Sequence, residues 1–286
     1  MERVKAQLHW YALGFLFCLT AVIWYAVFAE DRRGLLTVSF LDVGQGDAIF
    51  IDSPTGVQVL LDGGPDRSVL RALSRVMPFY DRSVDALVVS NPDKDHIAGF
   101  IDILARFRVG AVIEPGTVSE TDTYKTLAAA VAEEGAARVL ARRSQSLDLG
   151  GGAELLILFP DRDVAELERN TGSIVAKLTY GQTSFLLMGD APSAIERYLV
   201  MLDGKRLNAD VLKVGHHGSH TSTSEELLAA ASPLFAVISS GEDNRYGHPH
   251  KEVLDRLVAA GVQIFRTDTG GTVSVVSGGE SIRLRK

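Results

Sequence analysis

The sequence predicts an α/β (α+β) fold in which two mixed sheets pack face to face with helices outside, preceded by one transmembrane helix. The first basis is an uncharged stretch near the N-terminus. The second is a series of short apolar runs, first grouped as hairpins and then alternating with amphipathic helices. The 286 residues contain no internal repeat or long linker and suffice for one large core. We therefore expect a tail over residues 1–7, an anchor over 8–29 and one folded domain over 34–286.

The anchor is predicted from residues 10–29, which carry no charge and would form a helix of about 30 Å, the thickness of a bilayer's hydrocarbon core. The alternative is a cleaved signal peptide with Arg3 and Lys5 as its charged region and residues 27–29 as its cleavage site. The apolar stretch exceeds the usual length of a signal peptide, which favours an uncleaved anchor. Arg32 and Arg33 balance the charges on the other side, so orientation rests on the short tail, which predicts an extracytoplasmic domain.

The folded domain is predicted from ten strand-like runs and three helical stripes. Apolar residues spaced as on one helix face occupy residues 69–77, 97–107 and 254–258, the last closed by Gly261. The expected strands are 36–41, 48–51, 57–61, 86–90, 155–159, 174–179, 185–188, 211–214, 235–239 and 262–265.

Charge and cysteine content exclude several kinds of site. The formal net charge is −7, which argues against a generally basic, phosphate-coating surface but leaves room for a local basic groove. Cys18 is the single cysteine, so no intrachain disulfide and no cysteine cluster for zinc can form. Any metal must be held by His, Asp, Glu or Asn side chains.

The first candidate metal segment follows the expected strand 86–90. Asn91, Asp93 and Asp95 place oxygen-bearing side chains at alternate positions, and His96 follows directly before a helix. Side chains beyond the carboxyl end of a strand lie where α/β sheets bind ligands. Two carboxylates and an imidazole this close together need a cation to offset their repulsion and desolvation. The alternative is an ordinary turn in which Asp93 or Asp95 caps the helix.

Further candidates follow three later strands. Asp190 ends the strand 185–188, and the loop after strand 211–214 holds three histidines with no evident packing role. We expect one of His216 and His217 to bind metal and the other to face substrate, because neighbouring side chains of extended chain point to opposite sides. His248 is a candidate acid or phosphate donor. A helix cap at Asp190 and a solvated histidine loop are the alternatives.

Together these segments resemble the metallo-β-lactamase superfamily, and more narrowly the domain of that fold in ComEC-type competence proteins. The resemblance runs from about residue 36 to the end, on segments 41–48, 61–64, 93–96, 170–173, 189–190, 216–219 and 244–249. It implies a four-layer αββα sandwich with a centre of one or two metal ions at one edge and metal-activated water as the nucleophile. In ComEC-type proteins the domain lies outside the membrane and is thought to degrade the DNA strand that is not imported.

Carried over by motif position, the resemblance implies a first metal site formed by Asp95, His96, Asp190 and His217. Asp190 would bridge to a second site containing Asp93. Asn91 stands where the family usually has histidine, and its weak amide oxygen together with the two carboxylates favours Mn²⁺ over Zn²⁺ there. The candidates for catalytic groups are Asp95, His216 and His248.

The leading hypothesis is a membrane-anchored, extracytoplasmic phosphodiesterase or nuclease related to DNA uptake. Its expected cofactor is Mn²⁺ or Zn²⁺, and its expected partners are the membrane, DNA and other DNA-uptake proteins. The first alternative is an esterase for a small phosphodiester or a phosphocholine group, which the acidic net charge favours. The second, suggested by Asn91, is a metal-poor binding module of a DNA-uptake assembly. Lys94, Lys213 and Arg245 are candidate phosphate contacts, with a solvated surface position as the alternative for each.

Overall fold

The structure, a computed structural model, describes residues 2–30 and 34–285. The chain divides into two compact units, one up to Gly34 and one from Leu35 onward. In the first unit, helix α1 (Glu2–Glu30) contains the stretch Gln7–Tyr25, which is long and apolar enough to cross a membrane. A signal sequence near the N-terminus can satisfy the same criterion of length and composition. Arg32 and Arg33, on which the orientation argument draws, lie outside the described residues.

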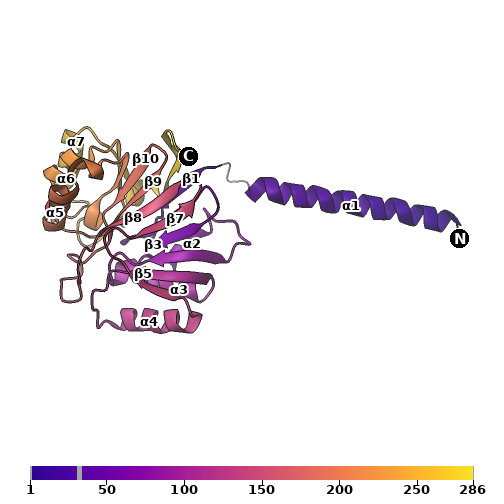
Figure 1. Ribbon diagram of the computed structural model, residues 1–286, viewed down its shortest axis with the longest axis horizontal. Helices are drawn as coiled ribbons and strands as arrows, with labels where there is room; N and C mark the ends of the chain where they lie inside the picture. The colour runs from indigo at the N-terminus through magenta and orange to yellow at the C-terminus, as the bar shows by residue number, and fades with distance from the viewer. Residues whose placement is uncertain (1, 31–33, 286) are drawn as a thin grey trace. The chain divides into compact units, whose positions relative to one another are not determined.

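The second unit contains two mixed sheets (Figure 1). The eight-stranded sheet has the order β15-β14-β1-β2-β3-β4-β5-β6, and the seven-stranded sheet has the order β13-β12-β11-β10-β9-β8-β7. The strands are β1 (Leu36–Phe40), β2 (Ile49–Asp52), β3 (Gln58–Leu61), β4 (Ser83–Val88), β5 (Arg108–Glu114), β6 (Ala137–Leu140), β7 (Ser146–Gly150), β8 (Ala153–Phe159), β9 (Val175–Tyr180), β10 (Thr183–Leu187), β11 (Val211–Lys213), β12 (Phe235–Ile238), β13 (Gln263–Arg266), β14 (Val273–Ser277) and β15 (Ile282–Arg285).

Helices cover the outer face of each sheet, and three buried clusters show the layering. One cluster joins the inner faces of the two sheets, and the other two join each outer face to its helices. Figure 1 shows α5, α6 and α7 together on one side of the strands and α3 and α4 on the other. The helices are α2 (Ser68–Leu73), α3 (Lys94–Leu104), α4 (Asp122–Glu134), α5 (Ser193–Asp203), α6 (Glu225–Ala231), α7 (Lys251–Ala259), α8 (Thr267–Gly270) and the 3₁₀ turns η1 (Gly204–Leu207) and η2 (Gly215–Gly218). The predicted four-layer αββα sandwich is confirmed.

The ten predicted strands are all present, with ends that differ by at most three residues. The predicted helical stripes are found in α2, α3 and α7. Strands β5, β6, β7, β14 and β15 were not predicted. The whole of β6 is exposed at a sheet edge, and β15 alternates half-buried Ile and Leu with exposed Arg, so neither forms a continuous apolar run.

The topology brings the carboxyl ends of several strands to one edge of the sandwich. Strand β4 runs parallel to β3, and β10, β11 and β12 run parallel to one another. The segments after these strands therefore meet at the same edges of their sheets, where open α/β sheets bind ligands. The candidate site residues follow these strand ends: Asp95 and His96 come after β4, Asp190 after β10, His216 and His217 after β11, and His248 after β12.

Close backbone packing fixes the start of α3 at this edge. The Gly99 N–H donates to the carbonyl oxygen of Gly64 over 3.1 Å, and the Gly63 N–H donates to that of His96 over 2.6 Å. A side-chain carbon at Gly99 would collide with the backbone oxygens of Gly63 and Asp66. The approach therefore requires glycine in the middle of a helix, where glycine is otherwise unfavourable.

We predict that Gly99→Ala lowers the free energy of unfolding by about 1–3 kcal/mol, because overpacking outweighs the better helix propensity of alanine. Urea denaturation measures the effect. The matched control is Gly270→Ala in α8, where the added carbon meets open space and φ is not positive, so stability should be unchanged or slightly raised. Equal effects at the two positions would contradict the packing argument.

Candidate metal centre

His96 is held between two carboxylates. It lies in the first turn of α3, is fully buried, and its Nδ1 is 2.8 Å from Asp62 Oδ2 while its Nε2 is 3.1 Å from Asp190 Oδ2. Asp62 also accepts a hydrogen bond from the Ser90 N–H over 2.8 Å, which fixes the carboxylate. A carboxylate on one ring nitrogen orients the other nitrogen, an arrangement common around metal-binding histidines. His96 therefore presents Nε2 to the edge of the sandwich.

His217 is oriented in the same manner by a backbone carbonyl. Its Nδ1 is 3.0 Å from the Ser239 carbonyl oxygen at the end of β12, and 3.3 Å from Asp47 Oδ1. Its Nε2 lies 3.4 Å from Asp95 Oδ2 and 3.8 Å from Asp190 Oδ1. With the Nδ1 proton donated to the carbonyl, the lone pair of the neutral ring is on Nε2, facing these two carboxylates.

The loop before His217 differs from the extended chain expected from the sequence. His216 and His217 both adopt left-handed conformations, with φ of 47° and 54°. This tight turn, rather than the alternation of an extended strand, directs the buried His217 inward and leaves His216 at the rim. His216 Nδ1 is 3.2 Å from Thr221 Oγ1, and its Nε2 is 3.9 Å from Asp190 Oδ2.

The donor set fits a divalent cation. Asp190 Oδ1 and His217 Nε2 are buried and have no hydrogen-bond partner in the described part of the chain. Potential ligand atoms of Asp95, His96 and His217 all lie within 4.8 Å of one another, as do those of Asp47, Asp190 and His217. Two imidazole nitrogens with carboxylate oxygens suit zinc and other first-row metals. The unpartnered atoms are those that a cation at this point would satisfy.

The pKa directions show the same excess of negative charge. Burial lowers the pKa of His217, but Asp190 and Asp47 outweigh it and raise the value to about 10. The pKa of His96 is raised well above its usual range because Asp190 and Asp62 outweigh its desolvation. Burial raises the pKa of Asp190, yet the two imidazoles hold it well below the ordinary range. The carboxylates therefore stabilise positive charge at the centre of the pocket, either on protonated imidazoles or on a cation.

The side chains expected at the second site, Asn91 and Asp93, make local contacts in the structure. The Asn91 side chain is fully buried; its Oδ1 accepts the Asp93 N–H over 2.9 Å and its Nδ2 donates to Asn170 Oδ1 over 2.7 Å. Asp93 Oδ1 is 2.7 Å from an Arg169 nitrogen. Burial raises the pKa of Asp93, although Arg169 opposes the shift. Asn91 and Asp93 are thus engaged by local partners, and Asp93 belongs to neither of the clusters of possible ligands described above.

A hollow of about 340 Å³ opens over the centre. Asp93, Asp190, His216, His217 and His248 are among the residues that line it. The His248 Nδ1 is buried without a partner among the described residues, and burial together with His217 and His216 lowers the pKa of His248 to about 4. A neutral imidazole still carries one N–H donor. At neutral pH His248 can therefore donate a hydrogen bond to a bound anion.

Sequence reasoning assigned no role to Asp47 or Asp62 and expected Lys213 to contact phosphate or solvent. Lys213 is fully buried in β11, and its Nζ lies 2.8 Å from Asp47 Oδ2 and 2.9 Å from the Val214 carbonyl oxygen. The expectation that Lys213 contacts phosphate is therefore wrong. Burial raises the pKa of Asp47, but Lys213 and His217 outweigh it and lower the value. The available signal was the lysine itself, a charged residue within an apolar strand.

Comparison with known families and proteins agrees with this geometry. The profile of the metallo-beta-lactamase superfamily matches residues 41–242. ComE operon protein 3 of Bacillus subtilis is 35% identical over 82% of this chain and 32% of its own length. Recombination protein 2 of Haemophilus influenzae is 32% identical over 91% of this chain and 31% of its own. Competence protein ComA of Neisseria gonorrhoeae is 30% identical over 87% of this chain and 33% of its own length. The chain thus spans about a third of the length of these curated relatives.

Solved structures share the fold at low identity. The metallo-beta-lactamase fold protein YhfI of Bacillus subtilis superposes with a TM-score of 0.55 at 12% identity, covering 82% of this chain and 98% of that protein. CmlA, a diiron β-hydroxylase from Streptomyces venezuelae, superposes with a TM-score of 0.54 at 15% identity, covering 84% of this chain and 53% of that protein. These likenesses show the fold alone.

We predict that Lys213→Met lowers the free energy of unfolding by about 3–5 kcal/mol, because it leaves Asp47 buried without its cation. Denaturant titration followed by circular dichroism measures the loss. The double variant Lys213→Met, Asp47→Leu should recover part of it, since the uncompensated charge is removed as well. A single variant as stable as wild type would show that the Lys213–Asp47 pair contributes little to the free energy of unfolding.

Proposed function

Because the chain belongs to the metallo-β-lactamase superfamily, we propose that it is a metal-dependent phosphodiesterase acting on DNA in competence, held at the membrane by α1. The one observation that carries the proposal is the pair of buried imidazoles whose Nδ1 atoms are anchored and whose Nε2 atoms face shared carboxylates. Members of this superfamily are usually metal-dependent hydrolases.

Asp95, His96, Asp190 and His217 are the proposed ligands of one divalent ion. When bound, such an ion would lower the pKa of a coordinated water and offset charge on a transferring phosphoryl group. The chain's own contribution is preorganisation: Asp62 and the Ser239 carbonyl fix the two imidazoles, and Lys213 neutralises Asp47 behind them. No side-chain nucleophile is required for this chemistry.

Residues at the rim are proposed to bind the substrate. His248 and His216 line the hollow over the centre, with ring centroids 5.7 Å apart, and each imidazole can donate a hydrogen bond to a phosphate oxygen. Asp95 lies partly exposed between the centre and the hollow, where its second oxygen can accept a hydrogen bond from a water molecule or a substrate hydroxyl. These positions give Asp95, His216 and His248 their proposed catalytic roles.

DNA is proposed as the substrate because relatives are named for competence and recombination. The same names suggest other DNA-uptake proteins as partners. The proposed organisation remains a tail over 1–7, an anchor over 8–29 and a hydrolase domain over 34–286 outside the cytoplasm. The apolar stretch Gln7–Tyr25 supports the anchor by its length and composition.

We predict that the full chain, purified in detergent, hydrolyses phosphodiesters with Mn²⁺ and that Asp190→Ala abolishes this activity. Asp190 faces both imidazoles, so its loss removes an oxygen ligand from the centre. His248→Ala should reduce the rate less, by about 10²- to 10⁴-fold, as expected for a donor to the substrate. Single-stranded DNA, duplex DNA and bis(p-nitrophenyl) phosphate are assayed side by side.

The controls separate loss of chemistry from loss of fold. Circular dichroism of each variant reports folding, and Lys125→Gln on α4 serves as a charge-removing control, since the lysine side chain is exposed and pairs with exposed Glu120. Hydrolysis of the small ester but of neither DNA would favour the small-phosphodiester esterase. Equal activity in Asp190→Ala, or none in the wild type with Mn²⁺ or Zn²⁺, would favour the binding module.

We further predict that the wild type binds one divalent ion tightly and that Asn91→His raises zinc affinity or stoichiometry, because imidazole is a stronger borderline ligand than an amide oxygen. The substitution also frees the Asp93 N–H and Asn170, so a modest loss of stability is expected. Titration calorimetry of both forms provides the measurement. Unchanged stoichiometry and unchanged zinc affinity would refute the role of Asn91 as the limit on a second site.

A further inference from the structure

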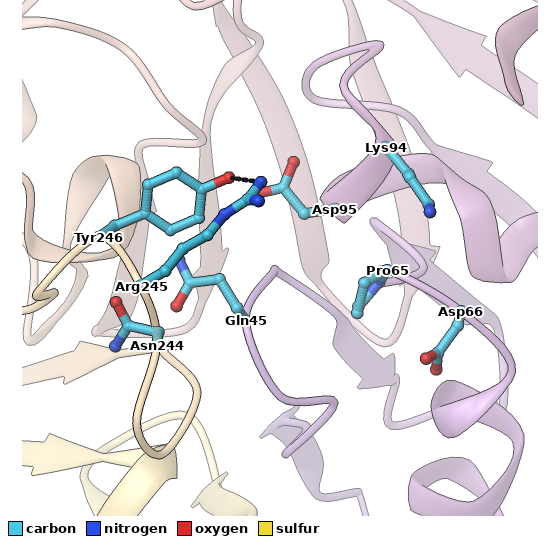
Figure 2. A pocket seen from close by; sticks show the side chains of 8 residues that line it. All are labelled: Gln45, Pro65, Asp66, Lys94, Asp95, Asn244, Arg245 and Tyr246. Carbon is cyan, nitrogen blue, oxygen red and sulfur yellow. Dashed lines mark hydrogen bonds between the residues drawn. The ribbon is translucent and has the colours of Figure 1, made fainter.

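A second hollow adjoins the one over the metal centre. It measures about 510 Å³ and shares Gln45, Lys94, Asp95 and Tyr246 with the first. Figure 2 shows Gln45 between two walls, with Pro65 and Lys94 on one side and Arg245 and Tyr246 on the other. The walls come from loops far apart in the sequence, so the hollow exists only in the folded domain. Its connection to the candidate centre makes it an extension of the substrate path.

We propose that this second hollow binds the neighbouring nucleotide of a single-stranded polynucleotide whose scissile phosphate lies at the metal centre. The inference rests on the proposed function and specifies its substrate as a polymer. In this arrangement Gln45, Lys94 and Arg245 contact the adjacent phosphate, and the base packs against the Arg245–Tyr246 pair.

Gln45 supplies an oriented donor without a partner. Its Oε1 accepts the Gly241 N–H over 3.1 Å, which determines the direction of the amide. Its Nε2 is buried and makes no hydrogen bond to any described residue. Buried donors are nearly always satisfied in folded proteins, so an unpartnered one lining a hollow indicates an acceptor supplied from outside. A phosphate oxygen is such an acceptor.

The charged side chains in the second hollow determine where a phosphate would bind. Lys94 and Arg245 bring one cation to each wall, whereas Asp66 adds a negative charge beside Pro65 (Figure 2). Asp95 is the other carboxylate, and it is turned to His217 as a proposed metal ligand. An anion is therefore attracted toward Gln45 and Arg245 and repelled from Asp66. The same two cations would repel a quaternary ammonium group, which disfavours phosphocholine esters.

Arg245 and Tyr246 form a surface suited to a base. The Arg245 guanidinium donates to the Tyr246 hydroxyl over 2.8 Å and its Cζ lies 4.9 Å from the ring centroid. Tyr246 also stacks on His248, with centroids 5.6 Å apart and planes inclined by 20°, yet it remains half exposed. Bases stack on aromatic rings and on guanidinium planes without sequence preference. This stack leads directly from the metal centre into the second hollow.

The size of the hollow and the stacking surface on its wall favour a single strand. A hollow of about 510 Å³ lies in the range that accommodates ligands of drug size, which includes one nucleotide. A base that packs against the Arg245–Tyr246 pair has left its neighbours in a stack, and a duplex would have to flip that base out at a cost in free energy. Single-stranded DNA or RNA enters without unpairing.

The test measures binding of single-stranded DNA by the full chain in detergent. The probe is a labelled oligothymidylate of ten nucleotides, and the readout is fluorescence anisotropy. Titrations are run in EDTA and again in Ca²⁺, with gels to verify that the strand stays intact. Arg245→Ala and Lys94→Gln should each weaken binding about 5- to 10-fold and reduce the slope of log affinity against log salt by about 0.7, the value for one contact to a single strand. Lys125→Gln is the matched control and should bind as wild type does.

A second variant tests stacking separately from charge. Tyr246→Leu should weaken binding of the oligothymidylate more than binding of an abasic strand of the same length, because only the former has bases to stack. Equal losses for both strands would overturn the base position. Duplex binding as tight as single-strand binding, an equal loss in Lys125→Gln, or no measurable binding by wild type would overturn the proposal.

The outcomes also distinguish this inference from the proposed function. If the wild type hydrolyses bis(p-nitrophenyl) phosphate while strand binding is indifferent to Arg245, Lys94 and Tyr246, the second hollow is not the subsite and the hydrolase stands. If strand binding depends on these residues while no phosphodiester is hydrolysed with Mn²⁺ or Zn²⁺, the subsite stands and the hydrolase fails.

Discussion

Four carboxylates converge on two buried imidazoles at one edge of the sandwich, and the need to balance their charge governs the structure around them. Asp62 and Asp190 flank His96, while Asp47, Asp95 and Asp190 surround His217. Burying such a cluster costs free energy unless cations compensate it. Lys213 supplies one cation from inside the core. The remaining negative charge faces the opening, where a divalent ion would be most strongly stabilised.

The fold meets this requirement with rigid supports. Each imidazole is oriented through Nδ1 by a group at the end of a strand or in an adjoining loop, so that both Nε2 atoms point the same way before any ion arrives. The glycines at 63 and 99 let backbone segments approach closely enough to hold the start of α3 against the loop after β3. A site positioned by packed backbone loses little entropy on binding, which is the physical basis of preorganisation.

The two packed sheets were predicted from strand patterning, and the inner members of the cluster from the family resemblance of short segments that follow strands. Asp95, His96, Asp190 and His217 each follow an apolar strand, where a polar side chain is conspicuous. Asp62, in a Leu-Asp-Gly-Gly segment, looks like any turn, and its role depends on a contact with His96, 34 residues away. Lys213 was expected to contact phosphate or to lie at a solvated surface position, because lysines are rarely buried, and its partner Asp47 from the loop after β1 explains its burial. The edge strand β6 was not predicted because neither of its faces is buried, so it has no alternating apolar pattern.

The acidic composition and a polyanionic substrate are compatible because the favourable charges are local. The formal net charge of −7 gives no general attraction for nucleic acid, and at physiological ionic strength exposed charges act over only about 8 Å. Lys94 and Arg245 stand on opposite walls of a hollow that opens beside the candidate centre, and a bound divalent ion would add its charge to theirs. The phosphate backbone of the proposed substrate would therefore be attracted to this hollow and repelled elsewhere. Such a distribution favours specific positioning of one segment of strand over coating of the polymer, as a hydrolytic enzyme requires and a packaging protein does not.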